Sequence, residues 1–305
     1  MTNVLVLGAT GMLGSMVFSM MRNQVGVDVR GTYRDTVPEA LQAVKDQLRP
    51  FDARQDPASE LKRIEANFRP DFIVNCIGII KPYCQDNDPD GVVRAIETNA
   101  LFPHRLAKAA EVVLPQTKII QIATDCVFSG KSGKYDESAK HDPLDVYGKT
   151  KSLGEVEADH VLNIRASIIG PEIKGHVSLL DWFLSQKKGA RLKGFAHHEW
   201  NGVTTLQFAE LCVMLMRGTT FKEWRDKGSR LHYVINETVD KYELLRLMKD
   251  VFERDYEIDR VTDIGEPVLR TLASKLLPME ARSMKQTLTQ VRDFSRQIPW
   301  YHLKS

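Results

Sequence analysis

Tyr147 and Lys151 are the residues whose types and spacing are best suited to acid–base chemistry. They form the pattern Tyr-x-x-x-Lys within residues 147–151 (YGKTK). On a helix, positions four apart lie on one face, which places the lysine ammonium beside the phenol. A free tyrosine has a pKa of about 10, and a fixed cation lowers that pKa toward neutrality. We therefore predict that Tyr147 exchanges a proton with a substrate oxygen and that Lys151 assists it.

A glycine-rich turn near the N-terminus is the second candidate site. The segment Gly8–Gly14 (GATGMLG) follows a predicted strand over Asn3–Leu7 and opens a predicted helix over Met12–Arg22. In this context the first glycine permits a tight turn, the second lets a pyrophosphate approach, and the third lets the helix pack closely. N–H groups at a helix start also attract phosphate. The expected dinucleotide contacts are Gly8, Thr10, Gly11, Met12, Leu13 and Gly14.

The end of the second predicted strand, Val27–Thr32, distinguishes the two nicotinamide cofactors. An acidic side chain there binds a ribose 2′-hydroxyl, whereas an arginine suits a 2′-phosphate. Residues 31–34 read GTYR, so no carboxylate ends the strand and Arg34 stands just beyond it, although Asp35 follows. We expect NADP(H), with NAD(H) as the alternative.

These motifs require a sheet that brings them together, and the first half of the chain predicts one. Short apolar strands alternate with helices, which is typical of a parallel sheet covered on both faces. The strands are expected at 3–7, 27–32, 71–77, 118–123 and 161–168, and the helices at 12–22, 39–48, 59–68 and 92–112. Beyond about residue 170 the alternation ends, with helices expected at 176–187, 206–217, 241–253 and 279–293 and a strand at 233–235.

The predicted fold is therefore α/β: a Rossmann-type doubly wound parallel sheet with a smaller, mostly helical C-terminal substrate lobe. The cofactor domain is expected over residues 1–170, with a return segment near 200–235. The discontinuous substrate lobe is expected over residues 171–305. Thr124 follows the strand at 118–123, so its hydroxyl would face the ligand crevice and align a carbonyl for hydride transfer.

Four stretches resemble the dTDP-4-dehydrorhamnose reductase (RmlD-like) family of extended short-chain dehydrogenases/reductases, and more distantly GDP-fucose synthase. They are Gly8–Gly14, Ala123–Phe128 (ATDCVF), Tyr147–Glu155 (YGKTKSLGE) and Arg165–Ser167 (RAS). The resemblance covers about residues 1–170, and residues 200–205 (WNGVTT) resemble the segment that returns to the cofactor domain. It implies reduction of a 4-keto-6-deoxy nucleotide sugar in deoxysugar or surface-polysaccharide biosynthesis. Hydride would go to C4, Tyr147 would supply the proton and Thr124 would orient the oxygen.

The resemblance also implies roles for residues that spacing alone does not single out. Asp52 would contact the adenine ring, Asn99 would support Lys151, and the lysine would hold the nicotinamide ribose. The remaining expected cofactor contacts are Cys76, Ile77, Gly78 and Tyr147. The expected substrate contacts are Lys81, Asp125, Cys126, His176, Trp182 and Asn201.

Two alternatives remain open. The family commonly has tyrosine at the place of Cys126 and an aromatic residue at Ile168, and related dehydratases have a glutamate base at Cys126. The missing glutamate argues against dehydration. GDP-fucose synthase has a cysteine there and a histidine that matches His176. The first alternative is therefore a bifunctional 3,5-epimerase/4-reductase that uses Cys126 and His176. Some relatives are non-catalytic regulatory subunits, including one that partners methionine adenosyltransferase.

Composition restricts the remaining classes of function. Lys plus Arg is 42 and Asp plus Glu is 40, which leaves a net charge of +2 and no general argument for nucleic acid or an anionic membrane. There is no signal peptide and no apolar run of about 18 residues, so a cytoplasmic protein is expected. No cysteine pair or histidine spacing predicts a metal site, and residues 197–199 (HHE) are expected to form a polar turn. Helices near 92–112 and 143–160 suit a homodimer face of the family.

Overall fold

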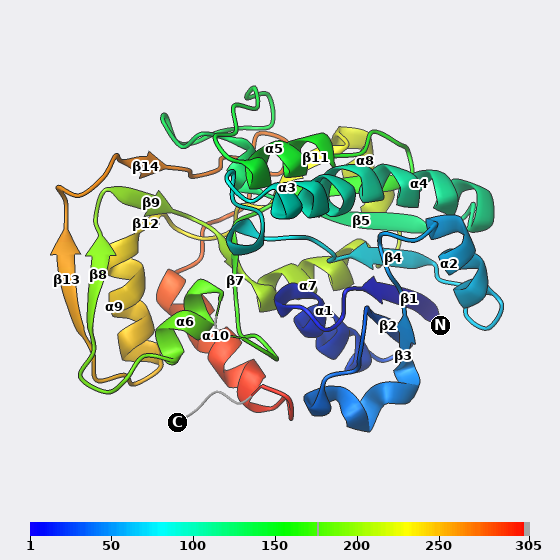
Figure 1. Ribbon diagram of the computed structural model, residues 1–305, viewed down its shortest axis with the longest axis horizontal. Coiled ribbons are helices and arrows are strands. Elements are labelled where there is room, and N and C mark those ends of the chain that lie inside the picture. Colours follow the sequence, from blue (N-terminus) through cyan, green and yellow to red (C-terminus); the bar gives the residue numbers. More distant parts are fainter. Residues whose placement is uncertain (176, 302–305) are drawn as a thin grey trace.

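The larger lobe is built on one parallel sheet (Figure 1). The computed structural model describes residues 1–175 and 177–301. Seven strands pair in the order β11-β6-β5-β4-β1-β2-β3, and every neighbouring pair is parallel. The strands are β1 (Thr2–Leu7), β2 (Val27–Tyr33), β3 (Leu48–Pro50), β4 (Phe72–Asn75), β5 (Lys118–Ala123), β6 (Val161–Arg165) and β11 (Arg230–His232).

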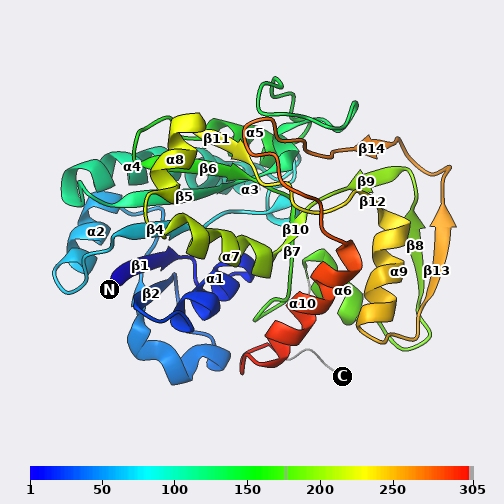
Figure 2. The same ribbon diagram turned by 180° about the vertical axis from the view of Figure 1, so that it is seen from behind.

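Helices cover both faces of the sheet, which explains why its central strands are almost wholly apolar. On one face α1 (Met12–Arg22) packs against α7 (Thr205–Leu215), and on the other α2 (Pro57–Glu65) packs against α4 (Phe102–Val113) (Figures 1 and 2). Leu5 and Leu7 of β1 point into one core and Val4 and Val6 into the other. The doubly wound α/β fold expected from the sequence is confirmed.

The strand order reverses beside β1, which has β2 on one side and β4 on the other. Ligands of open α/β sheets bind at the carboxyl ends of the strands at such a point. The glycine turn follows β1, and residues 76–78 follow β4, so both lie at this edge. Two 3-10 segments, η2 (Lys81–Tyr83) and η4 (Asp125–Val127), and the helix α5 (Val146–Leu153) line the same end.

The helix expected over residues 92–112 is divided into three parts. It consists of α3 (Pro89–Ala95), the π-helical segment η3 (Ile96–Leu101) and α4. The wider π turn carries Asn99, and π segments are frequent at functional sites. Residues 39–47, also expected to be α-helical, form the 3-10 segment η1 (Glu39–Gln47).

The smaller lobe combines helices with short strands that the sequence pattern did not reveal. Its helices are α6 (Leu179–Leu184), α9 (Lys241–Val251) and α10 (Met284–Arg296). The strands are β8 (Arg191–Phe195) with β13 (Glu257–Val261), and β9 (His198–Trp200) with β12 (Val239–Asp240) and β14 (Val268–Leu269). β7 (Ile168–Ile169) pairs with β10 (Val203–Thr204), after which α7, α8 (Thr220–Lys227) and β11 lie on the larger lobe.

Candidate functional site

The turn after β1 is shaped to receive a phosphate group. Gly8 has φ +77° and donates its N–H to the Thr32 hydroxyl at 2.9 Å. A Cβ on Gly14 would lie only 2.1 Å from the carbonyl oxygen of Gly8, so this position tolerates no side chain. Helix α1 begins at Met12 with no side-chain cap and no acidic residue in its first turn. The N–H groups at its start therefore suit the pyrophosphate of a dinucleotide.

Charged residues follow β2 and β3 at the carboxyl-end edge of the sheet. Arg34 pairs with its neighbour Asp35 at 2.7 Å, and both side chains are mostly exposed. Asp52 accepts a 2.6 Å bond from Arg54, and this contact lowers the pKa of the Asp52 carboxyl below its ordinary value. Because Asp35 already neutralises part of the Arg34 charge, Arg34 offers a 2′-phosphate less than a full free charge.

Tyr147 and Thr124 meet at the carboxyl end of β5. Asp145 caps α5 through the N–H of Gly148, and a Cβ on Gly148 would lie 2.2 Å from the Cys126 carbonyl oxygen. This close approach holds α5 against η4. Burial raises the pKa of the Tyr147 phenol above its ordinary value, and a hydrogen bond with Thr124 only partly opposes the rise. The prediction of a lowered Tyr147 pKa is therefore wrong for the chain by itself, since spacing does not report burial.

Lys151 lies one turn further along α5 and is buried. Its Nζ donates to the Ile122 carbonyl oxygen at 2.7 Å. Burial lowers the pKa of the Lys151 ammonium to about 8, and the nearby Glu155 carboxylate opposes part of that shift. Glu155 is itself held by both ends of the buried Arg165 guanidinium at 2.7 Å. The YGKTKSLGE and RAS stretches thus form one charge network behind the lysine.

Asn99 connects η3, the loop after β4 and α5. Its Oδ1 accepts from the Ile79 N–H at 2.8 Å, and its Nδ2 donates to the Ile79 carbonyl at 2.9 Å. The Nδ2 also lies 3.3 Å from the Thr150 hydroxyl. The structure records no direct hydrogen bond between Asn99 and Lys151 among the described residues. Asn99 therefore connects the loop after β4 to α5, and its expected support of Lys151 stays a prediction.

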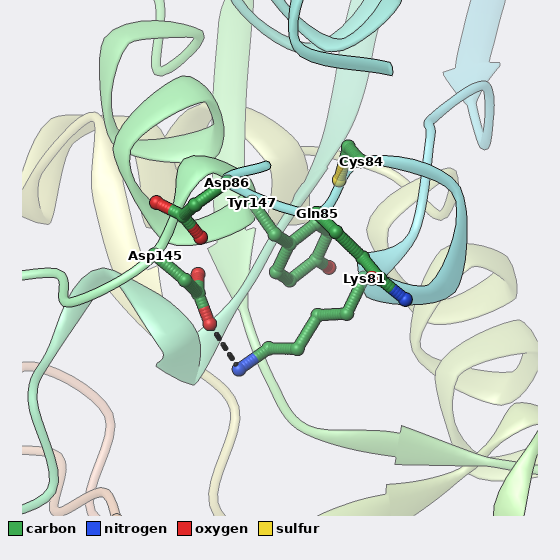
Figure 3. A pocket seen from close by; sticks show the side chains of 6 residues that line it. All are labelled: Lys81, Cys84, Gln85, Asp86, Asp145 and Tyr147. Carbon is green, nitrogen blue, oxygen red and sulfur yellow. Dashed lines mark ion pairs between the residues drawn. The ribbon is translucent and has the colours of Figure 1, made fainter. Parts of the chain in front are cut away.

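A cavity of about 180 Å³ opens beside the Tyr147 ring (Figure 3). Lys81 crosses it and pairs with Asp145 at 2.7 Å, with its Nζ 5.9 Å from the centre of the tyrosine ring. The other lining residues are Cys84, Gln85 and Asp86, which the sequence did not single out. Because Lys81 is already paired with Asp145, its positive charge is largely neutralised at the cavity wall.

Cys126 lies at the other side of Thr124, and its N–H donates to the Thr124 hydroxyl at 3.2 Å. Thr124 in turn donates to Oδ1 of the buried Asp125 at 3.1 Å. Burial raises the pKa of the Cys126 thiol to about 12, so the thiol is protonated at neutral pH. The same effect raises the pKa of Cys76, after β4, to about 12.

Two other expected substrate residues, Asn201 and Trp182, have no recorded bond to Thr124, Tyr147 or Lys151 in the described part of the chain. Asn201 is buried and uses its amide on the backbone of Leu272, at 2.7 and 3.0 Å, so its polar atoms serve the fold. Trp182 is partly exposed on α6. His176 lies outside the described residues. His197 and His198 bond backbone carbonyls, and within residues 1–175 and 177–301 no group of three metal-ligating side chains converges.

Two cations of the smaller lobe were missed by sequence reasoning. Arg270, after β14, donates to the carbonyls of Phe128 and Ser129 and places Nη1 3.8 Å from the Cys126 sulfur. Lys241, the first residue of α9, is half-buried with its Nζ 4.7 Å from the centre of the Trp200 ring. No motif or local spacing connects either residue to β5, so the sequence carried no signal for them.

The sheet order, the glycine turn and the Tyr-x-x-x-Lys helix define an extended short-chain dehydrogenase/reductase fold. The family model for the RmlD substrate binding domain matches residues 1–282. This chain therefore belongs to that family, as the resemblance predicted. Across the described part of the chain, no helix has the length and apolar composition that spanning a bilayer needs.

The sequence comparison and the structure comparison match differently named proteins. Methionine adenosyltransferase 2 subunit beta of Danio rerio is 27% identical over 260 residues, covering 82% of this chain and 73% of the relative. A dTDP-4-dehydrorhamnose reductase from Clostridium acetobutylicum superposes with a TM-score of 0.74 at 19% identity, covering 97% of this chain and all of the other. One from Bacillus anthracis, solved with NADP, gives 0.73 at 16% identity, covering 96% and 100%.

Proposed function

We propose that this chain is an NAD(P)H-dependent reductase of a 4-keto nucleotide sugar, with NADPH the favoured cofactor. The convergence of Thr124, Tyr147 and Lys151 at the strand end beside the glycine turn carries the proposal. The bound nicotinamide would supply a hydride to the carbonyl carbon. The protein's own part is to hold the carbonyl and to supply the proton.

The proton transfer follows from the state of the two hydroxyl groups. The raised pKa keeps Tyr147 protonated at neutral pH, which suits a proton donor in the direction of reduction. The Thr124 hydroxyl turns its proton from Asp125 to the carbonyl oxygen and aligns it. Lys151, charged below its pKa of about 8, holds a ribose hydroxyl with the N–H groups not used on Ile122.

Three further features support assignments around this reaction. A 2′-phosphate would contact Arg34, and the adenine would lie against Asp52 and residues 76–78. A homodimer through α3, η3, α4 and α5 is proposed because Val93, Leu101, Val112 and Leu153 are exposed there; light scattering would measure the mass. The proposed place of the reaction is the cytoplasm.

The test is oxidation of NADPH with a panel of 4-keto nucleotide sugars that bear either a methyl group (6-deoxy) or a carboxylate on C5, compared between the wild type and Tyr147→Phe. Loss of a general acid should lower kcat by about 100-fold or more while NADPH binding is retained. Tyr256→Phe is the matched control, because the recorded bond of that phenol is to the Gln186 carbonyl in the smaller lobe. A Tyr147→Phe protein with the wild-type rate would remove the proposed mechanism.

The same assay in deuterated water tests whether epimerisation precedes reduction. A base must abstract a proton beside the carbonyl, and the raised pKa of Cys126 makes its thiolate a minor species at neutral pH. We therefore expect no deuterium at C3 or C5. Deuterium at either carbon would make Cys126 and His176 epimerase residues.

A regulatory subunit is the second candidate, since several relatives of 26–31% identity are beta subunits of methionine adenosyltransferase 2. That function would require tight cofactor binding without turnover of any sugar. It would also require a measurable complex with a methionine adenosyltransferase. The intact proton-transfer residues favour the reductase.

A further inference from the structure

The end of η4 is bordered by positive charge that the described residues do not neutralise. Lys241 has no hydrogen-bond acceptor and no carboxylate within 4.0 Å among residues 1–175 and 177–301; its recorded contact is the Trp200 ring. The Trp200 indole is fixed by donation to the Ser167 hydroxyl at 2.8 Å. Asp240 caps α9 through the N–H of Glu243, so Lys241 starts from a fixed helix end. Among the described residues the ammonium therefore has the Trp200 ring as its recorded contact and no recorded hydrogen bond.

The charges around this lysine leave an excess of one cation. Arg270 gives its bonds to neutral carbonyls and to the Cys126 sulfur, and no carboxylate of the described residues forms an ion pair with it. The charged groups that face Lys241 are Asp125 and Arg270. Lys81 is already neutralised by Asp145 at 2.7 Å. Two cations against the single carboxylate of Asp125 leave one positive charge, which one bound oxyanion would balance.

This excess charge lies beside the reacting centre. The Cys126 N–H bonds the Thr124 hydroxyl, and Arg270 Nη1 is 3.8 Å from the Cys126 sulfur. A sugar carbonyl held by Thr124 and Tyr147 therefore has these cations next to its own ring. The diphosphate of a nucleotide sugar is attached at C1, across the ring from a C4 carbonyl. A carboxylate on C5 would instead sit next to the carbonyl.

From this placement we propose that Lys241 and Arg270 form a carboxylate subsite, and that the sugar reduced by this chain bears an acidic group on the ring beside the carbonyl. The inference rests on the proposed reductase function and specifies its substrate class. Arg270 would contact the carboxylate from the Cys126 side and Lys241 from the Trp200 side. Sugars with a neutral substituent at C5 would leave both half-buried cations uncompensated.

Binding of matched nucleotide sugars tests the subsite. UDP-glucuronate and UDP-glucose differ only in having a carboxylate or a hydroxymethyl group on C5, and their dTDP counterparts and the free nucleotides complete the set. Titration calorimetry with NADP⁺ present should show about 10- to 100-fold tighter binding of the glucuronates, as expected for a charge-assisted contact. Lys241→Met should remove the difference, and Lys241→Arg should restore it. Lys188→Met, an exposed lysine of the same lobe, is the control.

The outcomes separate the two proposals. Equal affinity of the wild type for the acidic and neutral sugars overturns the subsite and leaves the reductase standing. If Lys241→Met weakens UDP, UDP-glucose and UDP-glucuronate alike, the cations bind the diphosphate and the subsite is again overturned. If no nucleotide sugar binds although NADP⁺ does, both proposals fail. Melting temperatures of all variants identify any loss through misfolding.

Discussion

The reduction rate should fall as pH rises through the pKa of Lys151. The ammonium is buried against the Ile122 carbonyl, and burial lowers its pKa to about 8 although Glu155 opposes the shift; Cys76 is the other titratable group that faces it. With that pKa, about nine-tenths of the molecules hold a charged lysine at pH 7 and about one-tenth at pH 9. We expect kcat/KM for NADPH-dependent reduction to fall about tenfold over this interval. The raised pKa of Tyr147 keeps the proton donor intact throughout.

Stability should change in the opposite direction, which separates this loss of activity from unfolding. The Lys151 pKa is lower in the folded chain than in the unfolded one, so the unfolded state binds more protons between about pH 8 and 10.5. The contribution of this group to the free energy of unfolding therefore rises with pH. The melting temperature should not drop with the rate, and Lys151→Met should be inactive without being less stable.

Controls identify the titrating group. The Lys151→Arg variant should be slower than the wild type. Because its side chain keeps its charge, its rate should not fall further between pH 7 and 9. The pKa of Lys241 is also lowered by burial to about 8, with Asp125, Cys126 and Arg270 facing it, so the profile must be repeated in Lys241→Met with a neutral sugar. Burial and the nearby Lys241 charge lower the pKa of His198, so this group titrates below this range. A profile that stays flat to pH 10 in the wild type would refute the reasoning.

Two further predictions concern the cofactor and the loop after β4. Arg34→Ala should weaken NADPH binding several-fold more than NADH binding, measured by fluorescence titration, because only NADPH carries the 2′-phosphate; equal losses would remove that role. Asn99→Ala leaves both polar backbone groups of Ile79 without their partner and should cost about 1–3 kcal/mol of unfolding free energy in urea, together with activity. The exposed Asn67→Ala is its control, and an Asn99→Ala protein of wild-type stability and rate would refute the positioning role.

The parts of the site that depend on local spacing could be predicted from the sequence. The glycine turn and the helix with Tyr147 and Lys151 each lie within a few residues, so strand and helix periodicity places them. The same periodicity indicated the parallel sheet but not β8 or β13, because these strands mix charged residues with few apolar ones and lack the continuous apolar run of the buried strands. The burial of Tyr147 could not be predicted either, because it depends on which segments pack over the site. This is why the pKa of Tyr147 moves opposite to the prediction.

The substrate side of the site arises from tertiary contacts and could not be predicted in this way. Arg270 is 144 positions from Cys126, and Lys241 lies on a helix of the other lobe. Keeping such cations in a partly dehydrated crevice is costly: for the buried Lys151, a pKa near 8 corresponds to a penalty on the order of 3 kcal/mol at neutral pH. A regulatory subunit that bound the cofactor would also compensate the charge of Lys151, so this lysine does not separate the two functions. Lys241 and Arg270 would be compensated only by a bound substrate, so these two cations favour the reductase over the regulatory subunit.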